Sequence, residues 1–327
     1  MRPYEQSWLA GPDPYGEAAR ALAEAGLDVH SWVVLAHNSR LGEEHPHTSV
    51  RNAYGDRYPW APCIARPEVR AYLLDLAAEA AVRPGTRGTE LESCGWYGLA
   101  HLHAHDKIGG VPLGGAAQYL MALCFGGSCS VGYAELGADP DELRQSVERA
   151  LRPGWSGETT ADSGDRAGEW AQVEKALGGD HAAVFATWRD RIACSLRRDA
   201  IAAVRAAAGP DFQILLHADP APHRLGANVG VDPADVLAQT DGVVLPCTGG
   251  KAARSAVLTP FAAHRTERTV LAANFTVVTG MGGSPSSLAE DAAHAASLGA
   301  DEIRLCHAGL ASGADPTSVR AALTHLR

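Results

Sequence analysis

Residues 212–219 read Phe-Gln-Ile-Leu-Leu-His-Ala-Asp, an apolar run that closes on two polar side chains, His217 and Asp219. Apolar runs of this length, alternating with helices of about 10–15 residues, are typical of buried parallel strands joined by helical crossovers. Polar side chains at the ends of several strands favour a closed barrel, because that fold places its functional groups there. The same ending recurs at His37 and Asn38, Glu90 and Glu92, Asn274 and Thr276, and His307.

The pattern therefore predicts an α/β protein with a (β/α)8 barrel of the TIM type. Strands are expected at residues 32–37, 89–92, 212–217, 242–246, 269–275 and 302–307. Helices are expected at residues 15–25, 67–81, 139–150, 182–208, 288–298 and 316–326, with an amphipathic segment around 116–125. Since a barrel needs eight strands, we expect an incomplete or open barrel whose first two strands are shortened or missing at the N-terminus. The prediction is one domain, 1–327, with a helical insertion and flexible loop around 138–182.

The composition and charge of the chain indicate which classes of partner it binds and in which cellular compartment we expect it. The 327 residues are 46% hydrophobic and 20% charged, which is ordinary for a globular protein. The formal net charge of −10 argues against a nucleic-acid or anionic-membrane partner, and no apolar stretch is long enough to span a bilayer. The first residues contain no apolar signal core. We expect a cytoplasmic protein with a small-molecule or carbohydrate substrate, and the sequence is compatible with a homo-oligomer.

The seven cysteines are odd in number and scattered, which suits a reducing compartment. Only Cys124 and Cys129 lie close together in the sequence, with four residues between them. Because structural zinc sites usually need four ligands, we expect buried thiols here. No cofactor is expected, and a zinc or other divalent metal ion is the less favoured alternative.

Glu90 and Glu92 are the first candidates for catalysis. The period of two along a strand puts both carboxylates on one face, with Cα atoms about 6–7 Å apart. Two carboxylates that face one cavity repel, so we expect one of them to have a raised pKa and to act as a proton donor. The competing interpretation is a structural ion pair with an arginine.

Three alternating histidines follow, in His101-Leu-His103-Ala-His105-Asp106. Imidazole is a common ligand of zinc and iron, so this loop is a candidate metal site, with His217 as a further ligand. The alternative is a polar loop in which His103 and His105 line a cleft and bind substrate hydroxyls. We favour cleft lining and predict no metal ligands.

Two other groups of residues suggest substrate contacts. The loop after the first strand carries neutral and charged hydrogen-bonding groups beside aromatic rings, which suits a sugar; its candidates are His37, Asn38, Arg40, Asn52, Asp56 and Arg57, with Trp96 further on. A structural loop that is held by its own hydrogen bonds is nearly as well supported.

His217 and Asp219 face the same way and form a candidate acid–base pair, although Asp219 before Pro220 also suits a turn cap. Asn274 and His307 are expected to contact substrate.

Four segments together resemble a known family. They are Trp-Val-Val-Leu-Ala-His-Asn-Ser-Arg-Leu-Gly (32–42), Arg-Asn-Ala-Tyr-Gly-Asp-Arg-Tyr (51–58), Glu-Leu-Glu-Ser-Cys-Gly-Trp (90–96) and Leu-Cys-Phe-Gly-Gly-Ser-Cys (123–129). The closing segment 305–312 is similar as well. These motifs resemble uncharacterised, alanine-rich actinobacterial proteins described as hypothetical glycosyl hydrolases. The resemblance implies a TIM-type barrel related to retaining glycosidases, whose proton donor is a Glu at the end of the fourth strand. That position corresponds to Glu90 or Glu92.

The sequence departs from this family in three places. The relatives have residues ahead of this Met1, and their cysteine motif more often reads Cys-Phe-Cys-x-x-Cys, whereas Gly126 stands at the middle position here. A retaining glycosidase also needs a second carboxylate at the seventh strand, but this strand ends in Asn274-Phe275-Thr276.

We therefore predict a glycoside hydrolase-like enzyme that acts on a sugar or a glycosylated small molecule. Glu92 or Glu90 is the general acid, and the other glutamate or Asp219 is the base. Two alternatives stay open: a metal-dependent hydrolase or lyase that uses the histidine loop, and a barrel that binds carbohydrate without cleaving it.

Overall fold

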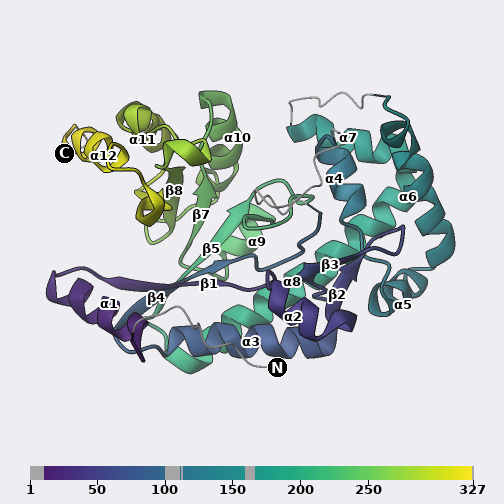
Figure 1. Ribbon diagram of the computed structural model, residues 1–327, viewed down its shortest axis with the longest axis horizontal. Coiled ribbons are helices and arrows are strands. Elements are labelled where there is room, and N and C mark those ends of the chain that lie inside the picture. The colour runs from purple at the N-terminus through teal and green to yellow at the C-terminus, as the bar shows by residue number, and fades with distance from the viewer. Residues whose placement is uncertain (1–10, 100–110, 112, 159–165, 326–327) are drawn as a thin grey trace.

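A computed structural model describes residues 11–99, 111, 113–158 and 166–325 of the chain. Its centre is a parallel sheet in the order β1-β4-β5-β7-β8-β9, to which the short β6 is added beside β5 (Figure 1). These strands are Val29–Val34 (β1), Thr86–Glu92 (β4), Gln213–Asp219 (β5), Val229–Gly230 (β6), Gly242–Pro246 (β7), Val270–Thr276 (β8) and Glu302–Cys306 (β9). A separate antiparallel pair consists of Ser49–Arg51 (β2) and Arg57–Pro62 (β3).

Helices connect and cover the strands. They are Pro14–Glu24 (α1), Ser39–Glu44 (α2), Pro67–Ala81 (α3), Gly115–Met121 (α4), Gly127–Glu135 (α5), Pro140–Trp155 (α6), Arg166–Leu177 (α7), Gly179–Ala208 (α8), Pro233–Leu237 (α9), Lys251–Ala262 (α10), Leu288–Ser297 (α11) and Asp315–Thr324 (α12). Short 3-10 segments lie at Pro46–Thr48, Thr279–Met281, Pro285–Ser287 and Ala308–Leu310.

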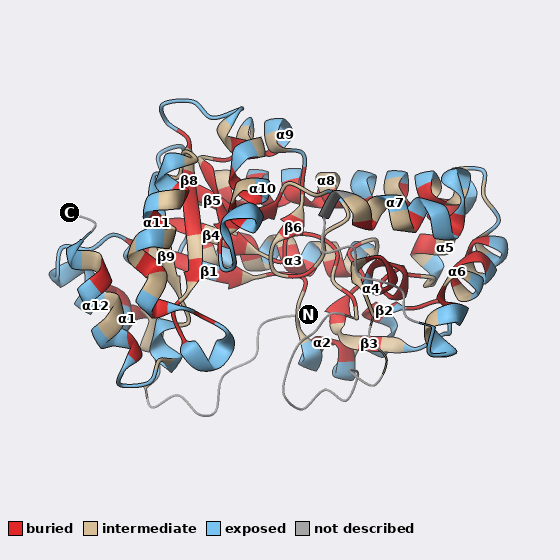
Figure 2. Cartoon of the chain, turned by 90° about the horizontal axis from the view of Figure 1, so that it is seen from above, coloured by how far each residue is buried: buried red, intermediate tan, exposed pale blue. Residues whose placement is uncertain are grey.

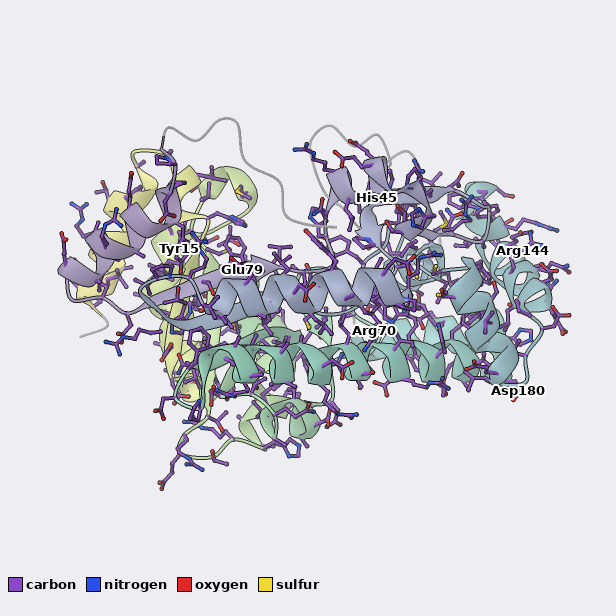
Figure 3. All side chains as sticks on the ribbon, turned by 90° about the horizontal axis from the view of Figure 1, so that it is seen from below. Tyr15, His45, Arg70, Glu79, Arg144 and Asp180 are labelled. Atoms are coloured by element: carbon purple, nitrogen blue, oxygen red, sulfur yellow. The ribbon has the colours of Figure 1, made fainter. Side chains whose placement is uncertain are left out.

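The sheet separates two cores. On its outer face, strand residues such as Leu91 and Leu216 join the main core together with the long helices α3 and α8. These two helices run side by side, with Arg70 of α3 bonded to Asp199 of α8 (Figure 3). The inner face holds a second, small cluster of buried side chains, contributed by Leu215, Val244 and Ala272.

The sheet is curled toward its inner face. Arg304 of β9 hydrogen-bonds Glu90 of β4, although three strands lie between them in the sheet order. In a flat sheet, four strand spacings of about 4.8 Å would separate the two backbones by about 19 Å, too far for these side chains to meet. The edge strands approach each other as well, because the ring of Trp32 in β1 lies 6.4 Å from the ring of His307 after β9. The result is a six-stranded parallel half-barrel.

A helical lobe lies at the other end of the molecule from α10, α11 and α12 (Figure 1). Helices α4, α5, α6 and α7 pack on one another, and α5 and α7 pack on α8. An aromatic cluster of Tyr133, Phe185 and Trp188 holds α5 against α8, with ring centroids 5.2–6.2 Å from Tyr133. The outer faces of α6 and α7 are exposed to solvent (Figure 2).

The predicted α/β fold and six parallel strands are confirmed, whereas a complete eight-stranded barrel is not. Helix α3 and strand β7 have the predicted bounds, and the other predicted elements shift by a few residues. Helix α6 extends past its predicted end at residue 150, through Pro153 to Trp155. The sequence pattern missed the helices α2, α5, α9 and α10 and the hairpin of β2 and β3. Within the described chain, no helix is both long and apolar enough to cross a membrane.

Candidate active site

Glu90 lies on the inner face and is fixed by side chains from three other strands, β1, β5 and β9. Its Oε1 accepts a hydrogen bond from Arg304 Nε at 2.7 Å, and its Oε2 lies 3.3 Å from His217 Nε2. The Nδ1 atom of His30 lies 3.8 Å from the Glu90 Oε1. His30 fits there because Gly88 has no side chain: a Cβ on Gly88 would lie 2.7 Å from His30 Nε2.

These contacts determine the protonation state of Glu90. Burial by itself raises the pKa of a carboxyl group, but the hydrogen bond with His217, the nearby imidazole of His30 and the charge of Arg304 outweigh it and hold the pKa of Glu90 far below its usual range. The expected raised pKa is therefore wrong for this residue. The competing interpretation, an ion pair with an arginine, holds for Glu90, with Arg304 as the partner. Glu90 is a permanent carboxylate, so it does not act as a proton donor near neutral pH.

Glu92 differs from Glu90 in its surroundings. It is the last residue of β4 and points to the same face. Burial and, to a smaller extent, the charges of Glu92 and Glu90 raise the pKa of the nearby Cys306 thiol. The indole Nε1 of Trp32 donates a hydrogen bond to Glu92 Oε2 at 2.9 Å. No arginine or lysine of the described chain forms an ion pair with Glu92. Trp32 is 55% exposed, so an aromatic face lies open to solvent beside this carboxylate.

His217 and Asp219 make separate interactions in place of the predicted pair. His217 is buried against Glu90, which orients its imidazole. The Oδ1 atom of Asp219 accepts a hydrogen bond from the backbone N–H of Ala221 at 2.9 Å, in the turn that follows β5. This is the turn cap that the sequence offered as the alternative.

Part of the loop predicted to bind sugar is held by its own hydrogen bonds. Asn52 is buried; its Nδ2 donates to Asp56 and to the hydroxyl of Tyr58, and its Oδ1 accepts from the backbone N–H groups of Tyr54 and Asp56. Both the nitrogen and the oxygen of the Asn52 amide therefore hydrogen-bond groups of the protein. Arg57 stands opposite Arg51 in the hairpin.

Two other predicted contacts lie at the start of α2. The Oδ1 of Asn38 accepts from the N–H of Leu41 at 2.9 Å, which makes Asn38 the N-cap, and Arg40 forms an exposed pair with Glu44. The sequence signal of an N-cap explains Asn38 without a substrate.

The two ring residues after β4 are placed differently. Trp96 is buried, its Nε1 donates to the carbonyl of Arg189, and that guanidinium stacks on its ring. A core position does not suit the predicted stacking on a substrate. Tyr97, in contrast, packs against His37 with ring centroids 4.8 Å apart. Burial, aided by the negative charge of Glu92, raises the pKa of its phenol.

Asn274 and His307 lie on the rim of the half-barrel. Asn274 neighbours Arg304 in the register of β8 and β9, and its Oδ1 is buried without a hydrogen-bond partner among the described residues. His307 has a left-handed backbone conformation (φ 62°), which turns the chain directly after β9 and sets its ring against Trp32. The predicted histidines His101, His103 and His105, with Asp106, lie outside the described residues.

Sequence reasoning missed Arg304, His30 and Trp32, which complete the cluster around the glutamates. One signal was available for Arg304: a charged residue in the middle of the strand pattern Glu-Ile-Arg-Leu-Cys.

Sequence reasoning also missed a mostly apolar cavity of about 600 Å³. Trp170, Arg189 and Pro220–His223 line this cavity, and the glutamates do not.

The sequence matches no family model and no curated protein. Solved structures resemble its fold. The glycoside hydrolase domain of PgaB (BpsB) from Bordetella bronchiseptica matches with a TM-score of 0.55 over 95% of this chain and 78% of that chain, at 11% identity. The β-galactosidases from Bacillus circulans sp. alkalophilus and Rahnella sp. R3 match with TM-scores of 0.54 and 0.53, at 9% and 12% identity. This chain covers 43% of each galactosidase chain. The fold is therefore glycosidase-like.

Proposed function

We propose that this chain is a glycoside hydrolase-like enzyme that acts on a sugar or a glycosylated small molecule, with Glu92 as its general acid. The observation that carries the proposal is the position of Glu92: it ends β4 on the inner face of a glycosidase-like sheet, hydrogen-bonded to the exposed indole of Trp32. Functional groups of β/α-barrels lie at the carboxyl ends of strands. A carboxyl group beside an aromatic face can protonate a glycosidic oxygen while the ring packs on the sugar.

Glu90 has a different role in this proposal. Its fixed negative charge, two residues before Glu92, faces the region where a sugar would lie and stabilises positive charge that develops at the anomeric carbon. Arg304 and His217 keep this carboxylate ionised and in place. Asp219 is left out of the catalytic set because it caps a turn.

A panel of aryl glycosides tests the proposal. Wild-type protein is expected to turn over at least one of them, and Glu92→Gln is expected to lose about 10²–10⁴-fold in kcat on substrates with a poor leaving group, such as phenyl glycosides. Glu79→Gln, on an exposed turn of α3, is the matched control and keeps the wild-type rate. No turnover of any glycoside by wild-type protein, or equal rates for Glu92→Gln and the control, would overturn it.

A second candidate function is carbohydrate binding without cleavage. The observation in its favour is β8, which carries Asn274 and Thr276 at its end, with no carboxylate along its length. Calorimetry that finds tight sugar binding in the absence of turnover would support this function. A measurable kcat would eliminate it.

The metal-dependent alternative involves His101, His103, His105 and Asp106, which lie outside the described residues, and His217, which is hydrogen-bonded to Glu90.

A further inference from the structure

Three cysteines from segments far apart in the sequence meet in the core between the β2–β3 hairpin and the helical lobe. Cys63 follows β3, Cys124 follows α4, and Cys129 lies in the first turn of α5. The Sγ atom of Cys63 is 3.7 Å from those of both Cys124 and Cys129, and all three sulfur atoms lie within 4.8 Å of one another. Each residue is at most 2% exposed.

The spacing of the sulfur atoms matches that of a metal site. Zinc binds thiolate sulfur at about 2.3 Å with tetrahedral geometry, which places two sulfur ligands about 3.8 Å apart. Two of the three separations are 3.7 Å and match this spacing, and the third, between Cys124 and Cys129, is within 4.8 Å.

The main chain around the thiols suits thiolates. The N–H of Gly126 donates to Cys124 Sγ at 3.4 Å, and the main chain at Arg51 and Ala65 hydrogen-bonds Cys124 and Cys63. N–H groups that donate to sulfur are a common second shell of metal–thiolate centres.

We propose that Cys63, Cys124 and Cys129 together bind one zinc ion, with the fourth coordination position on the side of Gly126. A Cβ on Gly126 would meet only the Sγ of Cys124, at 3.5 Å, so there is room beside this glycine for a water molecule or another small ligand. A divalent ion neutralises two of the three thiolates. A monovalent ion such as Cu⁺ would leave more buried negative charge, which is costly.

The ion would be structural. It joins the segment after β3 to α5, which is 66 residues further along the chain at Cys129, and so fixes the hairpin on the lobe. The site has no contact with Glu90 or Glu92 in the structure, so it is independent of the proposed catalytic function. Because the ligands come from segments that separate on unfolding, binding stabilises the folded chain.

Metal titration of the wild-type protein tests the proposal. Reduced protein, prepared without chelators, is expected to bind one equivalent of Zn²⁺ and to gain on the order of 5 °C in Tm. Co²⁺ at the same site is expected to give a thiolate-to-metal charge-transfer band. Less than 0.1 equivalent of either metal bound at micromolar concentrations would overturn the proposal.

Two variants locate the ion. Cys63→Ala is expected to lose the bound metal, whereas Cys94→Ala, at an equally buried thiol outside the cluster, keeps it. Equal metal content in these two variants would overturn the proposal. Gly126→Cys adds a fourth thiolate and is expected to hold the ion at least ten-fold more tightly against a chelator. The Gly126→Cys measurement tests the site even if Cys63→Ala does not fold. Unchanged or weaker zinc binding by Gly126→Cys would contradict a fourth coordination position beside Gly126.

Discussion

Arg304 and Glu90 form an ion pair across the inner face, with 2.7 Å between Nε and Oε1, although they are 214 residues apart in the sequence. The pair spans the concave side of the half-barrel from β9 to β4. It therefore fixes both the curvature of the sheet and the charge of the carboxylate that lies two residues before Glu92.

Replacement of Arg304 by Met should destabilise the protein. The Glu90 side chain is 13% exposed, so loss of its main cationic partner leaves a largely buried charge. We expect a loss of about 2–3 kcal/mol in the free energy of unfolding, measured by urea denaturation at pH 7. Arg304→Lys keeps the charge and should lose less. Equal stability of Arg304→Met and wild type would show that the pair does not hold the sheet.

The stability of the protein should fall in acid, in part because of Glu90. The folded-state pKa of Glu90 is far below the unfolded value of about 4.3. Its contribution is thus fully present above the unfolded pKa and is lost as the pH falls below that value toward the folded one. Unfolding free energies measured between pH 3 and pH 6 should show a smaller pH dependence for Glu90→Gln than for wild type. Identical slopes would contradict the lowered pKa.

Trp32 should contribute to substrate binding more than to stability. It is 55% exposed, so Trp32→Ala should change the free energy of unfolding by less than about 1 kcal/mol. We expect a raised KM for the active aryl glycoside, because the stacking surface is lost. Trp32→Phe keeps a ring but removes the N–H that reaches Glu92, so its defect should appear mainly in kcat. An unchanged KM for Trp32→Ala would remove the stacking role.

Asn52 should show the opposite behaviour. Asn52→Ala leaves the N–H groups of Tyr54 and Asp56 without their acceptor in the hairpin turn. We expect a loss of about 1–3 kcal/mol in unfolding free energy with no change in KM. The comparison of KM for Asn52→Ala and Trp32→Ala separates a structural loop from a substrate contact. A raised KM for Asn52→Ala would favour the sugar-binding interpretation of this loop.

The parallel strands could be predicted because their signal is local. Apolar runs such as residues 242–246 carry their own pattern, and β7 has exactly the predicted length. The sequence signal for helix α10 is weaker, since Gly249 and Gly250 precede the helix and Pro260 lies inside it. Sequence pattern therefore identified the sheet better than its helical cover.

The candidate site was harder to predict because its contacts are non-local. The period of two put Glu90 and Glu92 on one face, but no local pattern shows that Arg304 reaches Glu90. The sequence predicted a raised pKa for one of the two glutamates, and these non-local contacts rule it out for Glu90. The three-cysteine cluster was missed similarly: Cys63 is 61 residues from Cys124, and only the fold brings them together.

The most direct test of Glu92 as general acid is the dependence of kcat/KM on the leaving group of the substrate. A proton donor matters most when the departing oxygen is basic and least when it leaves readily as an anion. The account predicts that Glu92→Gln loses about 10²–10⁴-fold on alkyl or phenyl glycosides but stays near the wild-type rate on dinitrophenyl glycosides. An equal loss on every substrate, or no loss on any, would contradict it.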